Sequence, residues 1–269
     1  MAQRINLLVE RHWCCGIECS IVRCNQRLDG QFRCTYCRRK YSIRSGSFFD
    51  SFRRVPLVIL TRLVFYYFAQ GIGARRATRN IVRLGIRISR WTTFRIYEAV
   101  CESIQAYMER EIYSDVLGNI VEMDEALFIH RAGPGWRGLR QIWAAGLVER
   151  RTGNALVFIF PNRNHATINR IIRQNVMEGS TIVTDGWQSH SRIPRQYMHI
   201  NVNNNPRYTT SQVESLWGQL RSYVRNMYSG GVVEGNVNAI LIESLWRRNM
   251  NNQEEDITES LIYIIRNYS

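Results

Sequence analysis

The chain has 269 residues, of which 45% are hydrophobic and 11% aromatic, and this composition excludes a largely disordered protein. Its 36 Lys and Arg residues outnumber its 22 Asp and Glu residues and give a formal net charge of +14. Such an excess predicts a polyanionic partner, and because Lys40 is the single lysine, most of the charge is on arginines, which suit bidentate phosphate contacts.

No apolar run approaches the roughly 18–20 residues that a membrane-spanning helix needs. No cationic start followed by a long apolar segment marks a signal peptide. We therefore expect an intracellular protein that binds nucleic acid and no membrane. In a eukaryotic host it would have to enter the nucleus.

The N-terminal part of the chain is marked by clustered cysteines. Six of the seven cysteines lie between Cys14 and Cys37, which neither a random core nor a secreted disulfide scaffold of this length would produce. Cys34-Thr-Tyr-Cys37 has the spacing of one half of a zinc ribbon, and we predict Cys15 and Cys19 as the other half. A structural Zn²⁺ would replace the apolar core that about 40 residues cannot build alone. The alternatives left open are reduced thiols without metal, a contribution from His12, or the pairs Cys14 with Cys19 and Cys19 with Cys24.

Three helical segments follow the cysteines, separated by glycine-containing breaks. They run from Pro56 to Gln70, from Ala74 to Arg83 and from Ser89 to Arg110, with Ser89 as the N-cap of the third. The arrangement predicts a helix-turn-helix that could place a helix in the major groove of DNA. A basic footprint on the second and third segments supports DNA binding, with these predicted contacts: Arg75, Arg76, Arg79 and Arg90. The alternative is a three-helix spacer with a solvated basic face.

After Gly118 the periodicity changes from helical to strand-like. We expect a helix from His165 to Met177 and strands at Asn119 to Ile129, Gln141 to Glu149, Asn154 to Phe160, Thr181 to Thr184 and His199 to Val202. The first three strands would form an antiparallel meander. With a final helix, this is the element order of the ribonuclease H-like fold, an α/β fold with a mixed sheet and helices on both faces.

Three acidic residues fall at informative places in this predicted fold. Asp124 lies on the first strand, Asp185 directly follows the fourth, and Glu214 lies at the edge of the apolar stripe of the last helix. Together they predict a divalent-metal site, because Mg²⁺ takes oxygen ligands and a pair of such ions can catalyse phosphodiester displacement. Glu125 should point to the face of the strand opposite Asp124.

Arg221, seven residues after Glu214, shares its side of the helix and could contact a substrate phosphate. The alternative for this pair is that Glu214 complements the helix dipole and Arg221 is solvated.

Several motifs occur in a characteristic order along nearly the whole chain: Cys34-Thr-Tyr-Cys37-Arg-Arg-Lys-Tyr41, Val121-Glu-Met-Asp-Glu125, the loop Gly135-Trp-Arg-Gly138, Thr181-Ile-Val-Thr-Asp-Gly-Trp187, Ile200-Asn-Val-Asn203 and Thr210-Ser-Gln-Val-Glu-Ser-Leu-Trp-Gly-Gln-Leu-Arg221. In this order they resemble the Merlin superfamily of DDE transposases and its bacterial insertion-sequence relatives of the ISXO type. Two departures are the irregular first cysteine pair and Tyr208 to Gln212, where many relatives have a His-Thr-Gln type sequence.

The resemblance implies a DNA transposase that binds terminal inverted repeats and catalyses strand cleavage and strand transfer into target DNA. Asp124, Asp185 and Glu214 would be its metal-binding triad, using Mg²⁺ or Mn²⁺, and Arg221 would occupy a position where many relatives carry Lys or Arg. Transposition needs two ends held together, so a homodimer or a larger synaptic assembly is expected.

We expect three parts: a zinc-ribbon-like subdomain at 1–50, a helix-turn-helix-like region at 51–117 and a catalytic domain at 118–269. Two other functions stay open. A domesticated transposase would act as a sequence-specific DNA-binding regulator without cleavage, and a ribonuclease H-like nuclease would act on RNA/DNA hybrids or branched DNA.

Overall fold

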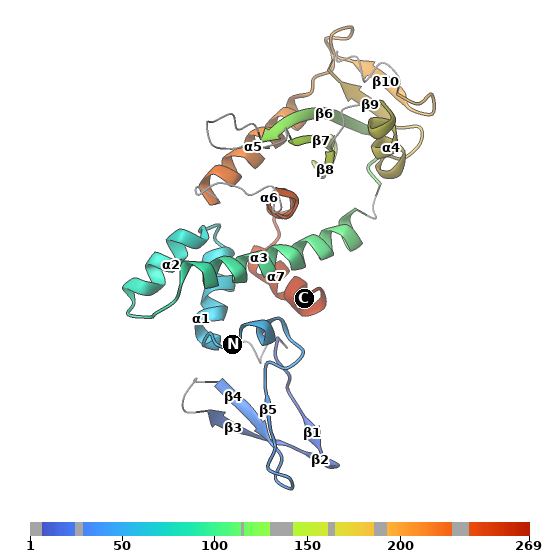
Figure 1. Ribbon diagram of the computed structural model, residues 1–269. Coiled ribbons are helices and arrows are strands. Elements are labelled where there is room, and N and C mark those ends of the chain that lie inside the picture. Colours follow the sequence, from blue (N-terminus) through green and yellow to red (C-terminus); the bar gives the residue numbers. More distant parts are fainter. Residues whose placement is uncertain are drawn as a thin grey trace. The chain divides into compact units, whose positions relative to one another are not determined.

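The computed structural model describes residues 7–24, 29–113, 116–129, 142–160, 165–185, 193–227 and 237–269. The chain forms two compact units, one of Met1–Ile104 with Asp256–Ser269 and the other of Gln105–Glu255 (Figure 1). The predicted loop at 135–138, together with Gly186 and Trp187, lies outside the described residues. The three-part division of the chain stays a prediction.

The first unit begins with short antiparallel strands. They are β1 (Trp13–Cys14) paired with β2 (Ile17–Glu18), and the three-stranded sheet of β3 (Ser20–Cys24), β4 (Asp29–Arg33) and β5 (Lys40–Ser42). The buried apolar side chains described between residues 7 and 43, cysteines aside, are Leu7, Leu8, Phe32 and Ile43. So small a core does not hold a region of this size together without a further cross-link.

The first unit contains the three helical segments expected from the sequence and two helices that were not expected. The expected segments are α1 (Leu57–Arg62) continuing as a π-helix η2 (Leu63–Phe68), α2 (Ala74–Arg83) and α3 (Arg90–Tyr107). The other two are a 3-10 turn η1 (Phe48–Phe52) and α7 (Ile257–Asn267). Ser89 caps α3, because its Oγ accepts a hydrogen bond from the Thr92 N–H at 3.0 Å. The buried Thr78 hydroxyl on α2 donates to the Thr93 hydroxyl on α3 at 2.9 Å and so joins the two helices.

The second unit is built on a five-stranded mixed sheet. Its strands are β6 (Ile120–Ile129), β7 (Ile142–Glu149), β8 (Ala155–Phe160), β9 (Thr181–Thr184) and β10 (Met198–Asn201), in the spatial order β10-β9-β6-β7-β8. Strands β6, β7 and β8 form the predicted antiparallel meander, whereas β9 pairs parallel with both β6 and β10. Gly153 turns β7 into β8 at a φ of +71°, a conformation that glycine adopts without strain.

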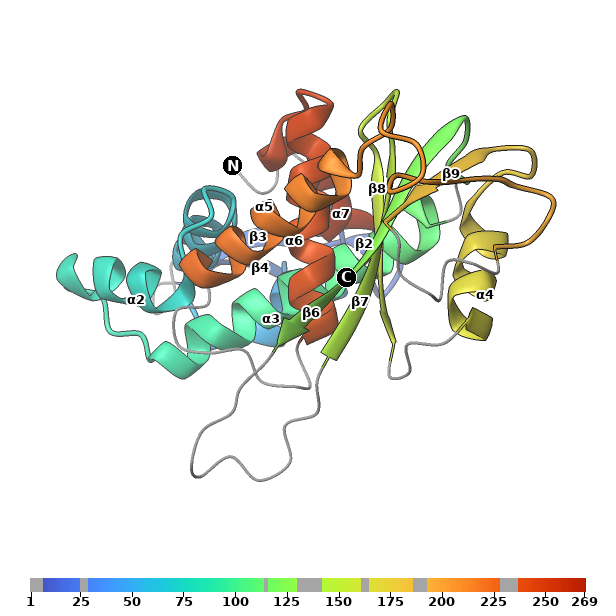
Figure 2. The same cartoon turned by 90° about the horizontal axis from the view of Figure 1, so that it is seen from above.

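Helices cover both faces of this sheet (Figure 2). On one face α4 (His165–Asn175) packs on Val121 and Met123 of β6 and on apolar residues of β7, β8 and β9. On the other face α5 (Ser211–Met227) contacts β6 and β7, and α6 (Val237–Asn252) contacts β8. Because side chains alternate along a strand, Glu122 and Asp124 point to the α5 face. A single-turn π-helix, η3 (Met108–Ile112), precedes the sheet.

No helix within the described ranges is long and apolar enough to cross a membrane.

Candidate active site

Asp124 on β6 and Asp185 directly after β9 lie side by side, because β6 and β9 are neighbouring parallel strands. The β6–β9 pairing ends with Met123 opposite Thr184, so the next residue of each chain segment is one of these two aspartates. The Thr184 hydroxyl, buried directly before Asp185, donates to the backbone carbonyl of Asp185 and lies 2.9 Å from His199 Nε2 on β10. The structure thus brings two of the three predicted acids together at the C-terminal end of the β6–β9 pairing.

The environment of Asp124 disfavours its negative charge. Burial, and next the charge of Asp185, raises the pKa of Asp124 from 3.8 to about 6. The backbone N–H of Glu125 and the indole of Trp217 act in the opposite direction. Two close carboxylates that repel each other are a donor set that a divalent cation would stabilise.

Trp217 on α5 fixes the orientation of the Asp124 carboxylate. Its indole Nε1–H donates to Asp124 Oδ2 at 3.2 Å, and its ring is 3% exposed. The ring can lie this close to the sheet because Gly146 is the residue of β7 opposite Asp124. A Cβ at position 146 would come within 2.8 Å of the Trp217 ring and 3.1 Å of Leu216. The absence of a side chain at Gly146 therefore makes the Asp124–Trp217 contact possible.

Replacing Gly146 with Ala will therefore push Trp217 away from Asp124. We expect the free energy of unfolding, measured with urea, to fall by about 1–3 kcal/mol, as for other overpacked cores. Gly218→Ala is the matched control, since Gly218 lies on an exposed part of α5 and a Cβ there would meet nothing within 4 Å. That control should gain up to about 1 kcal/mol from helix propensity. Equal effects at both positions would contradict the close approach.

Glu214 lies in the first turn of α5, one turn before Trp217, and is exposed. Its carboxylate accepts a hydrogen bond from the Thr210 hydroxyl at 2.9 Å. Within the described residues, Asp124, Asp185 and Glu214 do not form a group whose ligand atoms all lie within 4.8 Å. The structure therefore places Glu214 on the helix that contacts Asp124, but it does not gather the three carboxylates into one such group.

Two neighbouring predictions concern orientation. Glu125 is buried and follows Asp124 in β6, so strand alternation places it on the opposite face, as expected. Arg221 is exposed on α5, as is Glu214 two turns before it. The assignment of metal ligands and of a phosphate contact among these residues stays a prediction.

The N-terminal thiols form a second candidate metal centre. Ligand atoms of Cys14, Cys15, Cys34 and Cys37 all lie within 4.8 Å of one another. Three of the four predicted zinc ligands are therefore together, with Cys14 as the fourth member of the group. Cys19 is buried outside this group, and burial, followed by the nearby charge of Cys34, raises the pKa of its thiol.

The geometry of this thiol group suits Zn²⁺. Cys14 Sγ lies 3.7 Å from Cys15 Sγ and 3.5 Å from Cys37 Sγ, close to the roughly 3.8 Å between sulfurs on a tetrahedral zinc with about 2.3 Å bonds. The backbone N–H of Cys37 donates to Cys34 Sγ at 3.4 Å, and this bond is the main reason why the pKa of Cys34 is lowered to about 7. Hydrogen bonds with Cys37 and Cys14 raise the pKa of Cys15 to about 12. Crowded thiols of this kind become good ligands when a cation neutralises the thiolates.

The predicted DNA-contact arginines line α2 and the start of α3. Arg75, Arg76 and Arg79 are exposed on α2, whose buried side consists of small and apolar side chains. Arg90 is the first residue of α3, and the next residue, Trp91, is 74% exposed. A helix pair with an exposed basic and aromatic surface can bind the DNA backbone.

Comparison with known protein families gives one match. Residues 116–249 match a family described as the ISXO2-like transposase domain. No curated protein matches the chain significantly.

Similar solved structures include a chain of the simian T-cell lymphotropic virus intasome in complex with the PP2A regulatory subunit B56 gamma, at 15% identity, with a TM-score of 0.37 over 49% of this chain and 48% of that one. The present chain thus spans about half the length of that relative. The HTLV-2 integrase catalytic core domain in complex with magnesium is also similar, in its dimeric form at 10% identity, with a TM-score of 0.32 over 49% of this chain and 84% of that one.

Proposed function

We propose, from the match of residues 116–249 to the ISXO2-like transposase family, that the protein is a DDE transposase of the insertion-sequence type. It binds the terminal inverted repeats of its element, cleaves the DNA strand there and joins the freed end to target DNA. The observation that carries this proposal is the adjacent pair Asp124 and Asp185 inside the matched domain. We place the domain in the ribonuclease H-like fold on its strand order and assign the chain to the Merlin group on its motif order.

In this proposal Asp124, Asp185 and Glu214 hold Mg²⁺ or Mn²⁺ at the edge of the parallel strand pair. When bound, the ions supply Lewis acidity to the attacking oxygen and to the scissile phosphodiester. Asp124 is oriented by the Trp217 indole, and its raised pKa is that of a carboxylate whose charge a cation would stabilise. Arg221 contacts a phosphate of the bound DNA strand. The reaction then needs no covalent intermediate with the protein.

The N-terminal unit provides DNA binding in the same proposal. A structural Zn²⁺ is held by Cys15, Cys34 and Cys37 with Cys19, as predicted from the sequence, or with Cys14, which lies nearer to the other three. The exposed arginines of α2 and α3 contact the DNA backbone. Two ends must be held together during transposition, so the active form is a homodimer or a larger assembly that works where the host DNA is, in the nucleus of a eukaryote.

Replacing Arg75 and Arg79 together with Ala should reduce the salt dependence of DNA binding. Each phosphate that an arginine no longer neutralises lowers the slope of log K against log salt concentration by about 0.9, so two such phosphates lower it by about 1.8. Fluorescence anisotropy with repeat DNA at several salt concentrations measures this slope. Arg53→Ala is the control, since the Arg53 guanidinium pairs with Asp50 and is not on α2. An unchanged slope in the double variant would show that Arg75 and Arg79 of α2 do not contact DNA phosphates.

The direct test is strand transfer on a labelled duplex that carries the element's own terminal repeat. We expect the wild-type protein to join the repeat end to a target plasmid with Mg²⁺ or Mn²⁺ and to be inactive in EDTA. Binding without cutting under either metal would overturn the catalytic proposal and leave a DNA-binding regulator as the better account. Preferred cleavage of an RNA/DNA hybrid would favour a ribonuclease H-like nuclease.

A further inference from the structure

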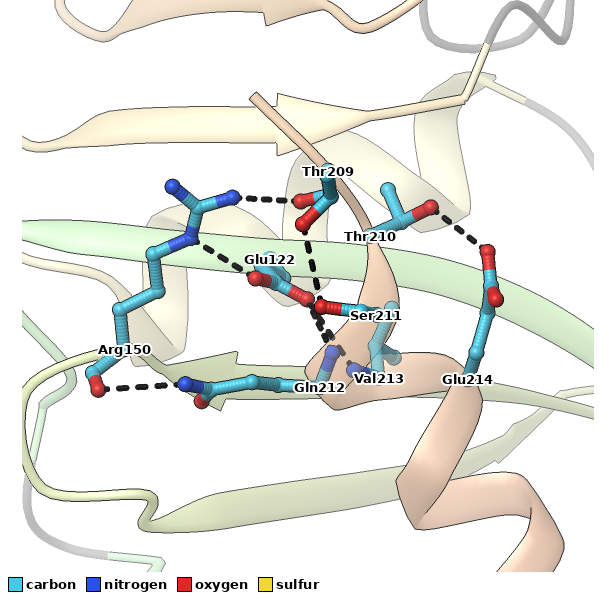
Figure 3. Close-up of polar contacts among 8 residues, drawn as sticks. All are labelled: Glu122, Arg150, Thr209, Thr210, Ser211, Gln212, Val213 and Glu214. Atoms are coloured by element: carbon cyan, nitrogen blue, oxygen red, sulfur yellow. Dashed lines mark hydrogen bonds and ion pairs between the residues drawn. The ribbon is translucent and has the colours of Figure 1, made fainter. Parts of the chain in front are cut away.

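Glu122 is a buried carboxylate whose hydrogen bonds reach the start of α5. Its side chain is 1% exposed. Glu122 Oε2 accepts from the backbone N–H of Gln212 at 2.8 Å and of Val213 at 3.2 Å. Glu122 Oε1 accepts from Arg150 Nε at 2.7 Å (Figure 3). A strand residue thus accepts from the two N–H groups that a helix cap usually satisfies.

The residues that would normally cap α5 are engaged elsewhere. The Thr210 hydroxyl donates to Glu214 Oε1 at 2.9 Å, and the Thr209 hydroxyl lies 3.0 Å from the Ser211 hydroxyl (Figure 3). The first turn of α5 therefore depends on Glu122 for its cap. The negative charge of Glu122 is also favourable at the positive end of the helix dipole.

Arg150 connects the segment before α5 to Glu122. While its Nε donates to Glu122, its Nη2 donates to the backbone carbonyl of Thr209. In return, the backbone carbonyl of Arg150 accepts from Gln212 Nε2 at 3.4 Å. We call Glu122, Arg150 and the N–H groups of Gln212 and Val213 the α5 clamp.

The clamp connects the helix that carries Glu214 to the strand that carries Asp124. Glu122 and Asp124 are two residues apart on one face of β6, a separation of about 7 Å. Strand β6 therefore holds α5 at two points, at its first turn through Glu122 and one turn further on through the Trp217–Asp124 bond. Glu214 lies between these two points.

We propose that Glu122 and Arg150 are positioning residues that fix the first turn of α5 beside the strand of Asp124, so that the exposed Glu214 side chain need only turn to complete the metal site of Asp124 and Asp185 when an ion binds. This inference rests on the proposed function of the site. Glu122 itself is no metal ligand, because it is buried and both of its oxygens accept hydrogen bonds from the clamp. It acts on the metal through the first turn of α5.

The test is Mn²⁺ affinity, measured by titration calorimetry on the full chain. Glu122→Gln replaces an acceptor oxygen by an NH₂ group among three N–H donors, so the clamp loses at least one bond. We expect Mn²⁺ affinity to fall roughly tenfold, as for other residues that orient metal ligands. Arg150→Lys changes a side chain that is 24% exposed and should therefore disturb the fold less. We expect it to cause a smaller loss of Mn²⁺ affinity. It keeps the test valid if Glu122→Gln fails to fold.

A double-mutant cycle separates positioning from general destabilisation. If Glu122 acts through Glu214, then Glu122→Gln costs no further Mn²⁺ affinity in a Glu214→Gln background. Glu243→Gln is the matched control, because Glu243 on α6 is also a buried carboxylate that accepts from an arginine Nε, that of Arg247, and it bonds α5 at Tyr223, more than two turns after Glu214. That variant should lower stability and leave Mn²⁺ affinity unchanged.

Amide hydrogen exchange gives a readout that does not require activity. We expect faster exchange at Gln212 and Val213 in Glu122→Gln. Unchanged exchange, unchanged Mn²⁺ affinity, or an equal loss of affinity with and without Glu214 would each overturn the positioning role. A wild-type chain that binds Mn²⁺ and shows the expected cycle but never joins DNA ends would overturn the proposed transposase activity alone.

Discussion

An Asp124→Asn variant should bind terminal-repeat DNA as well as the wild type and join ends about 10³-fold more slowly. Asn offers a weaker oxygen ligand to the metal, and losing the stabilisation that a metal gives to the transition state costs several kcal/mol, at about 1.4 kcal/mol per tenfold in rate. The Asn side chain can still accept the hydrogen bond of the Trp217 indole, so the local geometry is kept. Strand transfer and electrophoretic mobility shifts on the same DNA measure the two properties.

The same variant should be more stable than the wild type. Because the pKa of Asp124 is raised from 3.8 to about 6 in the fold, ionisation of this carboxyl destabilises the metal-free protein. After allowance for its partial exposure, the gain for Asn is on the order of 1–2 kcal/mol at about pH 7. The native state binds the proton more tightly, so this difference grows as the pH rises from about 4 to above about 6 and vanishes below about 4. Urea unfolding in EDTA at several pH values measures it.

Asp185→Asn should slow end joining by a similar factor of about 10³, and it should lower the pKa of Asp124 by removing a neighbouring charge. End joining by Asp124→Asn within tenfold of the wild-type rate would show that Asp124 is not a metal ligand.

Removal of zinc should unfold the cysteine-containing part of the first unit. The described apolar core there is small, and zinc-finger peptides gain about 10–16 kcal/mol of apparent folding energy from the metal. We expect one zinc per chain in the purified protein and none in a Cys34→Ser, Cys37→Ser double variant. Proteolysis should then cleave within residues 7–45, and affinity for repeat DNA should fall at least about tenfold, because the structural zinc would hold this DNA-binding part folded.

Single substitutions identify the fourth ligand. Loss of zinc in Cys14→Ser but not in Cys19→Ser would support the group seen in the structure, and the reverse result would support the pair predicted from the sequence. Cys101→Ala is the control, since Cys101 is buried on α3 and should leave the zinc content at one per chain. A chain that is fully folded and free of zinc would contradict the metal centre.

Sequence patterns predicted correctly those helices and strands whose ends are determined by neighbouring residues in the chain. Strand β9 has the predicted bounds because β-branched residues form the whole of Thr181–Thr184. Helix α2 also has the predicted bounds, since glycines precede and follow Ala74–Arg83. That Asp124 and Glu125 point to opposite faces followed from alternation along β6.

The features that the sequence did not predict depend on contacts between distant residues. Glu122 and Arg150 meet only because β6 and β7 pair, and Trp217 reaches Asp124 only because Gly146 leaves room for the ring. Helix α6 is buried on almost every side, and two of its buried residues, Glu243 and Arg247, form an ion pair. It therefore lacks the single apolar stripe by which a surface helix is recognised in a sequence. At Cys15 a φ of +53° in the turn between β1 and β2 lets adjacent cysteines join one group, which ligand spacing alone does not anticipate.

The assignment of Asp256–Ser269 to the same compact unit as Met1–Ile104 has a consequence for biosynthesis. The last segment of that unit emerges from the ribosome only after all of residues 105–255, which takes roughly 8–30 s at about 5–20 residues per second. The unit Gln105–Glu255 is therefore complete before the unit that carries the basic helices and the cysteines. A chain that stops before Asp256 therefore cannot assemble the full first unit, although the whole of the second unit has been made.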